Sequence, residues 1–408
     1  MRIAIFVEKY PAPYKTYFDA QFGEFVRAGH DVSIYSAGSS AAGVNERVLE
    51  YGLQDLTLHY PESAGSLPRD LRGIISGLST STFGARQAAR VTAGITPGRR
   101  RMADTARVLS IRGAAPDICI LHGLSAAAQF SWLRRAFPHV PVVLYYHGGE
   151  LPTTPPISDA AATAAFLAAD RVFTNTAFSR AHAIERGCPP ERIHVLPVGF
   201  ALDDYVPPAP RVYRRDGKLR LLSAGRMSEE KGFEYAIEAV KLLVQSGLTD
   251  ISYSLTGSGY YRTRLESLVR QEGLERHVHF LGTLSTSEVI RAMGEADVLL
   301  LPSTQVGNWV ENQACAVQEA MLMQTIVIVS RTGGVPESIP PDMEPFICEP
   351  GDPAGIAEAA RRVAAMADAQ IAELGVRGRT FVLQRYDIRE LNRRLLEESL
   401  HRPAAAVR

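Results

Sequence analysis

Short apolar runs alternate with longer amphipathic stretches along the first half of the chain. The run RIAIFV at residues 2–7 predicts a buried strand, and the stretch 14–28 repeats apolar residues at helical spacing. Strands alternating with helices are typical of a doubly wound parallel sheet. Further strands are predicted for DVSIYS at 31–36, DICIL at 117–121, PVVLYY at 141–146 and RVFTN at 171–175.

A stretch rich in proline interrupts this alternation near the middle of the chain. Residues 196–218, LPVGFALDDYVPPAPRVYRRDGK, break the pattern and predict a linker. We therefore place a first α/β domain at residues 1–198, the linker at 199–218 and a second α/β domain at 219–386.

The alternation of strands and helices restarts after the linker. The pattern predicts an α/β protein with two Rossmann-like, doubly wound parallel-sheet domains that face a central cleft. Ligands of such sheets bind outside the carboxyl ends of the strands, so site residues are expected in the strand-to-helix loops. The second domain has predicted strands at 219–225, 251–257, 277–282, 297–302 and 325–330, and predicted helices at 229–246, 260–272, 286–294 and 312–324.

Composition and charge are those of an ordinary globular protein. The 408 residues are 46% hydrophobic and 22% charged, and 44 basic residues balance 44 acidic ones, which argues against a nucleic-acid partner. Neither a signal peptide nor an apolar run of membrane-spanning length is apparent, so we expect a cytoplasmic protein, soluble or peripheral to a membrane. A reducing compartment also suits the four widely spaced cysteines, Cys119, Cys188, Cys315 and Cys348.

The loop SAGRMSEEKGF carries residue types that bind a diphosphate. Gly225 lets the chain leave the strand tightly, and Arg226 and Lys231 flank a turn that opens a helix. A solvated turn with internal ion pairs is the alternative interpretation. Gly257 and Gly259, in LTGSGYYRTRLE, form half of a Gly-x-Gly fingerprint. Because the chain has no Asp-x-Asp motif and no Walker lysine loop, we expect the protein itself to meet the phosphate charge, without a metal or cofactor.

The stretch ENQACAVQEAM at 311–321 places Glu311 and Glu319 eight positions apart. On a straight helix this spacing is about 12 Å along the axis and about 80° around it, so the two carboxylates could not share one proton or one metal. They would contact different ends of a long ligand. In the alternative interpretation, Glu311 only complements a helix dipole and Glu319 is a solvated helical glutamate.

The order of these motifs resembles a known protein family. SAGRMSEEKGF, LTGSGYYRTRLE, VHFLGTLSTSEV, ADVLLLPS, ENQACAVQEAM and TIVIVSRTGGVPESI resemble the carboxy-terminal domain of glycosyltransferase family 4, retaining enzymes of the GT-B architecture. RVFTNTAFSRAHAIERGCPPERIHVLPVGFALDDY is similar to the family's segment that leads into the linker. The resemblance is good from about residue 140 to 350. The last helical run, at 387–402, resembles the family's helices that cross back to the first domain.

The resemblance implies a nucleotide-sugar donor site in the second domain. In the family, the first glutamate of this motif lies by the hexose and the second holds the ribose hydroxyls. Glu311 would therefore contact the transferred sugar and Glu319 the ribose. Backbone N–H groups at a helix N-terminus would bind the sugar and the diphosphate, and these belong to Asn312, Gln313, Ala314 and Cys315.

The resemblance also implies how the bond to the nucleotide is broken. Arg226 and Lys231 match the family's basic pair on the diphosphate, and the backbone of Leu281 and Gly282 falls where the family reads the base. Bond cleavage places negative charge on the diphosphate, so preorganised cations and N–H groups would supply the main stabilisation. The family's usual account is same-face attack assisted by the leaving phosphate, and we name no enzyme base.

In the first domain, His147 ends the predicted strand in LYYHGGE. The family often has a histidine at such a position near the transferred sugar, where it would bond a sugar hydroxyl or the reacting centre. In the alternative interpretation, the His147 side chain only forms hydrogen bonds within the turn that ends the strand. Glu150 is interpreted as a charge on the rim. Trp309 is either a lid that stacks on a sugar or a loop aromatic that packs down.

The chain departs from the family in two loops. EKYPAPYKTYF has prolines and tyrosines where a Gly-Gly pair is common, which leaves the acceptor side open. ENQA replaces the usual Glu-Gly-Phe-Gly, and the preceding loop TQVGNWV is longer than the common form. The identity of the donor sugar therefore does not follow from the family.

Residues 63–115 hold nine arginines, no lysine and two aspartates. Arg99, Arg100 and Arg101 precede MADTARVLSIRG, which is predicted to form a helix with an apolar face. A basic amphipathic element of this kind would bind an anionic membrane surface and reach a lipid-linked acceptor. A solvated helix face over an ordinary core is the alternative.

The leading interpretation is a retaining, metal-independent hexosyltransferase of polysaccharide or glycolipid biosynthesis. It would move a hexose-type sugar from a nucleotide diphosphate sugar to a glycan or lipid-linked acceptor. A second interpretation keeps the catalysis but makes the acceptor a small soluble molecule. A third is a nucleotide-sugar-binding module that no longer transfers sugar. A dinucleotide oxidoreductase is disfavoured, because no complete Gly-x-Gly-x-x-Gly follows a strand.

Overall fold

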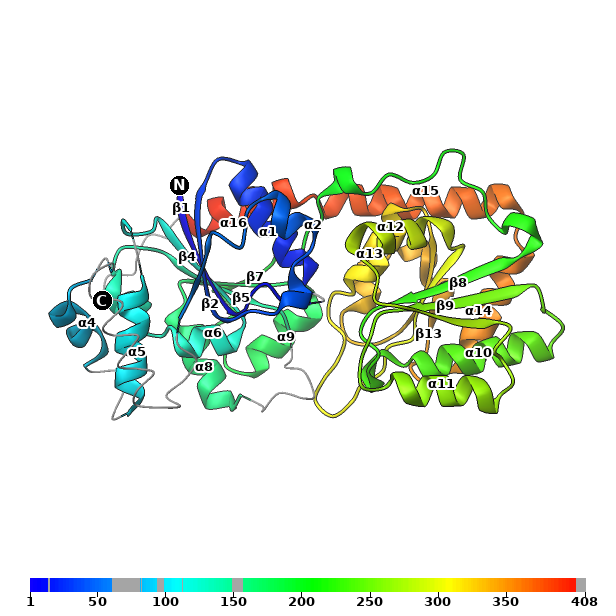
Figure 1. The fold of residues 1–408 in the computed structure, drawn as a ribbon, viewed down its shortest axis with the longest axis horizontal. Coiled ribbons are helices and arrows are strands. Elements are labelled where there is room, and N and C mark those ends of the chain that lie inside the picture. Colours follow the sequence, from blue (N-terminus) through cyan, green and yellow to red (C-terminus); the bar gives the residue numbers. More distant parts are fainter. Residues whose placement is uncertain are drawn as a thin grey trace.

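Two parallel sheets form the framework of the protein, one in each of two lobes (Figure 1). The first lobe contains a seven-stranded sheet and the second lobe a six-stranded sheet. This architecture confirms the predicted fold class. The computed structural model describes residues 1–13, 15–60, 81, 83–93, 99–111, 113–148 and 157–400.

The sheet of the first lobe is built from buried apolar strands. Its strands are β1 Arg2–Lys9, β2 Asp31–Gly38, β3 Thr57–His59, β4 Ile118–His122, β5 Val142–Tyr146, β6 Arg171–Thr174 and β7 Ile193–Val195. Their order across the sheet is β3-β2-β1-β4-β5-β6-β7. Every residue of β4 and β5 is buried, as expected for central strands that are covered on both faces. Periodicity does not predict β3 and β7, because an edge strand of three residues is too short to show it.

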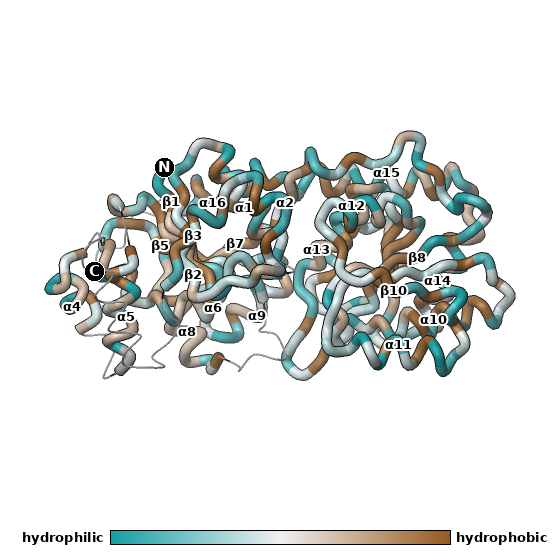
Figure 2. The backbone as a smooth tube through the Cα atoms, viewed as in Figure 1, coloured by the Kyte–Doolittle hydropathy of each residue, from teal (hydrophilic) through white to brown (hydrophobic). Residues whose placement is uncertain are grey.

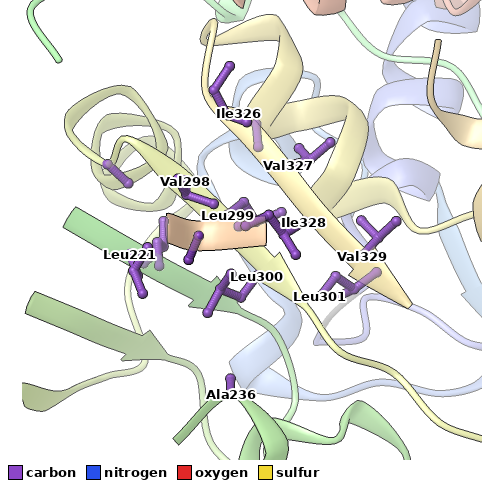
Figure 3. Packing of buried hydrophobic residues seen from close by; sticks show 14 of the residues in the cluster. Leu221, Ala236, Val298, Leu299, Leu300, Leu301, Ile326, Val327, Ile328 and Val329 are labelled. Carbon is purple, nitrogen blue, oxygen red and sulfur yellow. The ribbon is translucent and has the colours of Figure 1, made fainter. Parts of the chain in front are cut away.

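The sheet of the second lobe has the order β10-β9-β8-β11-β12-β13. Figure 3 shows side chains from three of its strands interdigitating, and of these Leu299 and Ile328 are at most 1% exposed. Close packing of such branched side chains excludes water and stabilises the lobe. The strands are β8 Leu219–Ala224, β9 Ile251–Thr256, β10 Val278–Gly282, β11 Val298–Leu301, β12 Ile326–Ser330 and β13 Ile347–Cys348.

Helices pack around both sheets, and Figure 2 shows hydrophobic residues concentrated along the strands inside each lobe. The helices of the first lobe are α1 Thr16–Arg27, α2 Glu46–Glu50, α4 Ala85–Thr92, α5 Arg99–Ser110, α6 Leu124–Gln129, α7 Leu133–Ala136, α8 Asp159–Ala168 and α9 Ala177–Glu185. Those that follow the linker are α10 Phe233–Gln245, α11 Arg262–Gln271, α12 Thr286–Glu295, α13 Cys315–Leu322, α14 Pro353–Ala365, α15 Asp368–Arg385 and α16 Ile388–Leu400.

Two predicted helices begin three or four residues later in the structure than periodicity indicates. The helix predicted from 229 is a 3-10 turn, Glu229–Lys231, that precedes α10. Gly232 separates them with a φ of 63°, and a Cβ there would lie 2.1 Å from the carbonyl oxygen of Pro302. Only glycine suits this crowded left-handed position. The helix predicted from 312 begins at Cys315, because Ala314 has non-helical backbone angles.

Within the described residues, the chain crosses between the lobes twice, once through the linker and once between α15 and α16 (Figure 1). On the return, Ile388 donates a backbone hydrogen bond of 3.1 Å to the carbonyl of Phe200 in the linker. Leu391 and Leu395 of α16 then pack into a core cluster of the first lobe. Asn392 adds a hydrogen bond of 3.0 Å to the carbonyl of Gln21 on α1. The last helix therefore packs with the first lobe.

Candidate donor site between the lobes

The carboxyl ends of three neighbouring strands of the second sheet lie backbone against backbone. Gly225, after β8, donates a 3.0 Å hydrogen bond to the carbonyl of Thr256, and Gly257 donates a 2.7 Å bond to that of Gly282. A Cβ on Gly257 would lie only 1.9 Å from the carbonyl oxygen of Gly225. The Gly-x-Gly motif thus lets two loops touch, and the exposed side chain of Leu281 lies at the same edge.

Arg226 and Lys231 lie on the loop after β8, and each faces an acidic partner. The Arg226 guanidinium donates to the Glu230 carboxylate at 2.6 Å and to the Ser228 hydroxyl at 3.2 Å. Burial disfavours the charge of Glu230, but the bond from Ser228 and the nearby Arg226 outweigh it and lower the pKa of this carboxyl. Arg226 is about a third exposed, so part of its guanidinium remains accessible.

Glu311 is held by the loop that carries Lys231. Its carboxylate accepts hydrogen bonds from Lys231 Nζ at 2.5 Å and from the Ser303 hydroxyl at 3.0 Å, and the residue is 7% exposed. The Lys231 ammonium also lies 5.6 Å from the centre of the Trp309 ring. Trp309 is itself 7% exposed, so this aromatic residue packs down. The structure therefore brings Lys231 and Glu311 into direct contact.

Glu319 lies on α13 and has a different set of partners. Its carboxylate accepts a 2.9 Å hydrogen bond from the hydroxyl of Tyr205, a fully buried residue of the linker. Burial raises the pKa of Glu319, although the Tyr205 bond and the charge of Arg47 oppose the shift. Periodicity and motif spacing do not point to Tyr205, and a single aromatic residue within a proline-rich linker is a weak signal in the sequence.

His147 follows β5 at the carboxyl edge of the first sheet, beside His122 at the end of β4. His122 Nδ1 lies 2.9 Å from His147 Nε2, and the two rings stack nearly parallel. Burial, with the charge of Lys15 next, lowers the pKa of His147 to about 3. Burial and the neighbouring His147 also lower the pKa of His122. Both imidazoles are therefore neutral near pH 7, and His122 is a site residue that the sequence analysis missed.

Asn312 and Gln313 do not start a helix, which corrects the prediction made for them. Because α13 begins at Cys315 with Ala314 as its N-cap, both residues precede the helix. Their side chains bond to the first lobe, where Asn312 donates to the carbonyl of His147 at 2.8 Å. Only the N–H groups from Cys315 onward belong to the first turn, where helices lack internal acceptors.

The arginine-rich segment is described in part. Arg86, Arg90 and Arg101 are exposed on α4 and α5. Arg107 is not part of a basic surface, which corrects the prediction, because it is 2% exposed and donates to the buried Asp104 at 2.6 Å. Residues 61–80, 82, 94–98 and 112 lie outside the described residues, as do the side chains of 99 and 100 and the predicted rim charge at 150.

The described part of the chain shows neither a cluster of metal-binding side chains nor a membrane-spanning helix. Within that part, no three side chains of His, Cys, Asp or Glu are grouped as metal ligands. In the same residues, no helix has the length and apolar character needed to cross a bilayer.

Two family models match the chain, one on each side of the linker. The glycosyl transferase 4-like domain matches residues 14–199, and the model of glycosyl transferases group 1 matches residues 210–379. The chain therefore contains the two domains of a glycosyltransferase, one 4-like and one of group 1. Among curated proteins similar to this chain, AmsK of Erwinia amylovora, an amylovoran biosynthesis glycosyltransferase, is 32% identical over 178 residues, which are 43% of this chain and 42% of AmsK.

Two further curated relatives are named for different substrates or products. WcaL of Escherichia coli strain K12, provisionally named a colanic acid biosynthesis glycosyltransferase, is 29% identical over 211 residues, 51% of each chain. The 2-deoxystreptamine glucosyltransferase of Streptomyces kanamyceticus is 32% identical over 139 residues, 34% of each chain. The chain spans about half the length, or less, of these three curated relatives.

Solved structures share this two-lobed fold over nearly the whole chain. Anabaena Alr3699/HepE in complex with UDP has a TM-score of 0.70 at 18% identity, covering 98% of this chain and 99% of that one. Sucrose-phosphate synthase from Thermosynechococcus elongatus has a TM-score of 0.71 at 18% identity and covers 98% of both chains. At 18% identity, these similarities show a shared fold and nothing about activity.

Proposed function

We propose that this chain is a retaining glycosyltransferase that moves a hexose-type sugar from a nucleotide diphosphate sugar to a glycan or lipid-linked acceptor. The observation that carries the proposal is the contact between Lys231 and Glu311, with Arg226 on the same loop. Cations at the carboxyl edge of a parallel sheet suit a diphosphate. The relatives named for amylovoran and colanic acid biosynthesis support a role in polysaccharide or glycolipid synthesis.

In this proposal Arg226 and Lys231 stabilise the leaving diphosphate. Negative charge develops on that group as the bond to the sugar breaks, and fixed cations in a water-poor cleft stabilise it strongly. The same cations supply the positive charge that a divalent metal would otherwise bring, so we propose a metal-independent reaction. Lys231 would then exchange its bond to Glu311 for one to the phosphate, which frees the carboxylate of Glu311 for the sugar.

The remaining site residues bind the two ends of the donor. Glu319 is proposed to bind the ribose, and Leu281 and Gly282 to lie by the base. His147 is proposed to contact the transferred sugar, and because it is neutral it could donate or accept a hydrogen bond without adding charge.

The test is ligand stabilisation of the whole chain. Thermal shifts would be measured with UDP-, GDP- and ADP-sugars and with the free diphosphates, with and without EDTA, because a ligand that binds only the folded state raises the melting temperature. We expect one nucleotide class to stabilise the protein without a metal. Loss of a bond to a charged group costs about 1.5–3 kcal/mol, so Arg226→Ala and Glu319→Ala should bind the nucleotide about 10–100-fold more weakly.

Exposed residues of the second lobe provide matched controls for these variants. Arg270→Ala and Glu275→Ala remove the same charges from surface positions and should leave the thermal shift unchanged. Stabilisation by none of the nucleotides would overturn the proposed function. NMR of the product would test the retaining outcome, which requires the anomeric configuration of the donor to persist.

A small soluble acceptor is a second candidate, favoured by the likeness to 2-deoxystreptamine glucosyltransferase. Exposed Arg86, Arg90 and Arg101 instead favour an anionic membrane at the cytoplasmic face. Flotation with vesicles of phosphatidylglycerol and phosphatidylcholine separates the two. Vesicle binding that is lost when these arginines are changed to glutamate supports a lipid-linked acceptor at the membrane. Absence of vesicle binding by the wild type supports the soluble acceptor. Tight nucleotide-sugar binding without turnover would point instead to a binding module.

A further inference from the structure

The loop between Glu311 and α13 is fastened to the first lobe by two amide side chains. Asn312 donates from Nδ2 to the carbonyl of His147 at 2.8 Å. Gln313 donates from Nε2 to the carbonyl of Val198 at 2.8 Å and accepts from the N–H of Val198 at 2.6 Å. Both residues are less than 10% exposed, so water does not compete for these bonds.

The amide of Asn312 is closely matched to its surroundings. Its oxygen accepts from the hydroxyls of Thr176 and Ser179, which lie at the start of α9 and are at most 3% exposed. Two hydroxyl donors face the oxygen and one carbonyl acceptor faces the nitrogen, so the network fixes which way the amide points. A Cβ on Gly148 would lie 3.1 Å from Asn312 Nδ2, so the adjacent glycine leaves room for the amide.

Glu337, another residue of the second lobe, also binds the start of α9. The carboxylate of Glu337 accepts from the backbone N–H groups of Ala177 at 2.7 Å and Phe178 at 2.8 Å. These are the first residues of α9, where unpaired N–H groups and the helix dipole favour a negative charge. Gly334, three residues earlier, donates to the carbonyl of Glu311 at 3.1 Å, so the two loops that contact α9 are bonded to each other.

This geometry links two residues of the proposed site across the lobe boundary. Glu311 binds Lys231 in the second lobe, and the next residue, Asn312, binds the backbone of His147 in the first. The spacing between the Glu311 carboxylate and the His147 ring therefore depends on the amide of Asn312. We propose that Asn312, supported by Gln313 and Glu337, is a positioning residue that holds His147 and Glu311 in register for sugar transfer. The inference rests on the proposed function.

The proposal predicts a split between donor binding and turnover. In Asn312→Ala the cations and Glu319 remain, so the Kd for UDP should change less than about threefold. The rate constant for transfer should fall about 10–100-fold, because small misplacements of reacting groups are costly. The matched control is Asn392→Ala, which removes a buried amide that also bonds a backbone carbonyl but lies on α16 against α1. This control should leave both quantities unchanged.

A structural readout keeps the inference separate from the proposed function. Hydrogen exchange of residues 142–148 and 176–182 should increase in Asn312→Ala and not in Asn392→Ala, whether or not sugar is transferred. A wild-type chain that binds no nucleotide but shows this exchange pattern would overturn the proposed function and leave the interlobe link supported. If Asn312→Ala does not fold, Ser179→Ala removes one donor to the same amide and takes its place. Unchanged turnover and exchange, or loss of UDP affinity parallel to turnover, would overturn the positioning role.

Discussion

The hydroxyl of Tyr205 donates a 2.9 Å hydrogen bond to the carboxylate of Glu319. Tyr205 belongs to the linker, and its neighbour Asp204 forms an ion pair with Arg47 of α2 in the first lobe. The positive charge of Arg47 also favours the ionised form of Glu319. The residue proposed to bind the ribose is therefore held by the segment that joins the lobes.

Removing this hydroxyl should change the pH dependence of nucleotide binding. Burial raises the pKa of Glu319 and the Tyr205 bond lowers it, so Tyr205→Phe should raise that pKa further. If binding requires the ionised carboxylate, affinity for UDP falls as the pH drops through this pKa. The fall should begin at a higher pH in Tyr205→Phe, as measured by calorimetric Kd values between pH 5 and 8.

The matched control for this variant is Tyr213→Phe. Tyr213 is also nearly buried, and its hydroxyl donates to the backbone carbonyl of Gln324 at 2.8 Å, away from Glu319. Its pH profile should follow that of the wild type. If UDP binding has the same pH midpoint in the wild type, Tyr205→Phe and Tyr213→Phe, then Tyr205 does not change the pKa of Glu319.

The contact between the loops after β8 and β9 should be sensitive to one methyl group. In Gly257→Ala the new Cβ would lie 1.9 Å from the Gly225 carbonyl oxygen, so the loops must separate. We expect more than tenfold weaker UDP binding in thermal-shift titrations. Gly273→Ala also has a left-handed φ, of 66°, but meets nothing within 4 Å. It should cost about 1–2 kcal/mol of stability and leave UDP affinity unchanged. Equal affinities for the two variants would refute the crowding argument.

Asp19 on α1 should make the stability of the first lobe depend on pH. It is 2% exposed and accepts hydrogen bonds from Tyr10 at 2.9 Å and Asn45 at 2.5 Å, while burial raises its pKa to about 6. The folded state thus binds the proton more tightly than the unfolded state. The free energy of unfolding should therefore decrease as the pH rises from about 4 to 6, by up to about 3 kcal/mol.

Urea unfolding at several pH values would measure this contribution. Asp19→Asn removes the titrating group, so the decrease between pH 4 and 6 should become smaller. Asp31→Asn changes an exposed aspartate of the same lobe and should keep the wild-type profile. A profile for Asp19→Asn that matches the wild type would contradict the assignment.

The last helix should stabilise the lobe at the other end of the sequence. Leu395 of α16 is fully buried in the core cluster that contains residues of β1 and α1. Leu395→Ala should cost about 2–5 kcal/mol, because it leaves a cavity that packing does not refill. Val376→Ala, on the exposed face of α15, should change stability by less than about 0.5 kcal/mol. Faster hydrogen exchange in α1 of Leu395→Ala would show that the first lobe is the part that loses stability. Faster exchange only in the second lobe would contradict the prediction.

The fold was largely predictable because its signals are local. β4 and β12 are fully buried strands made mainly of consecutive apolar residues, so the local sequence is enough to predict them. The start of α13 was not predictable in this way. Asn312 and Gln313 carry no strong breaker, and their side chains leave the helix because acceptors in the first lobe bind them. The edge strand β13, with two residues, is equally invisible to periodicity.

The sequence by itself determined the alternating elements, the positions of the loops and the residue types at the candidate donor site. Periodicity depends on neighbouring residues and predicts the elements and loops, and the resemblance to glycosyltransferase family 4 implies a donor-site role for Arg226, Lys231, Glu311 and Glu319. Only the tertiary structure decided which partners those residues have. Tyr205 and Glu319 are 114 positions apart, and His147 and Asn312 are 165 apart. Contacts over such separations depend on how two lobes pack, which no local pattern encodes.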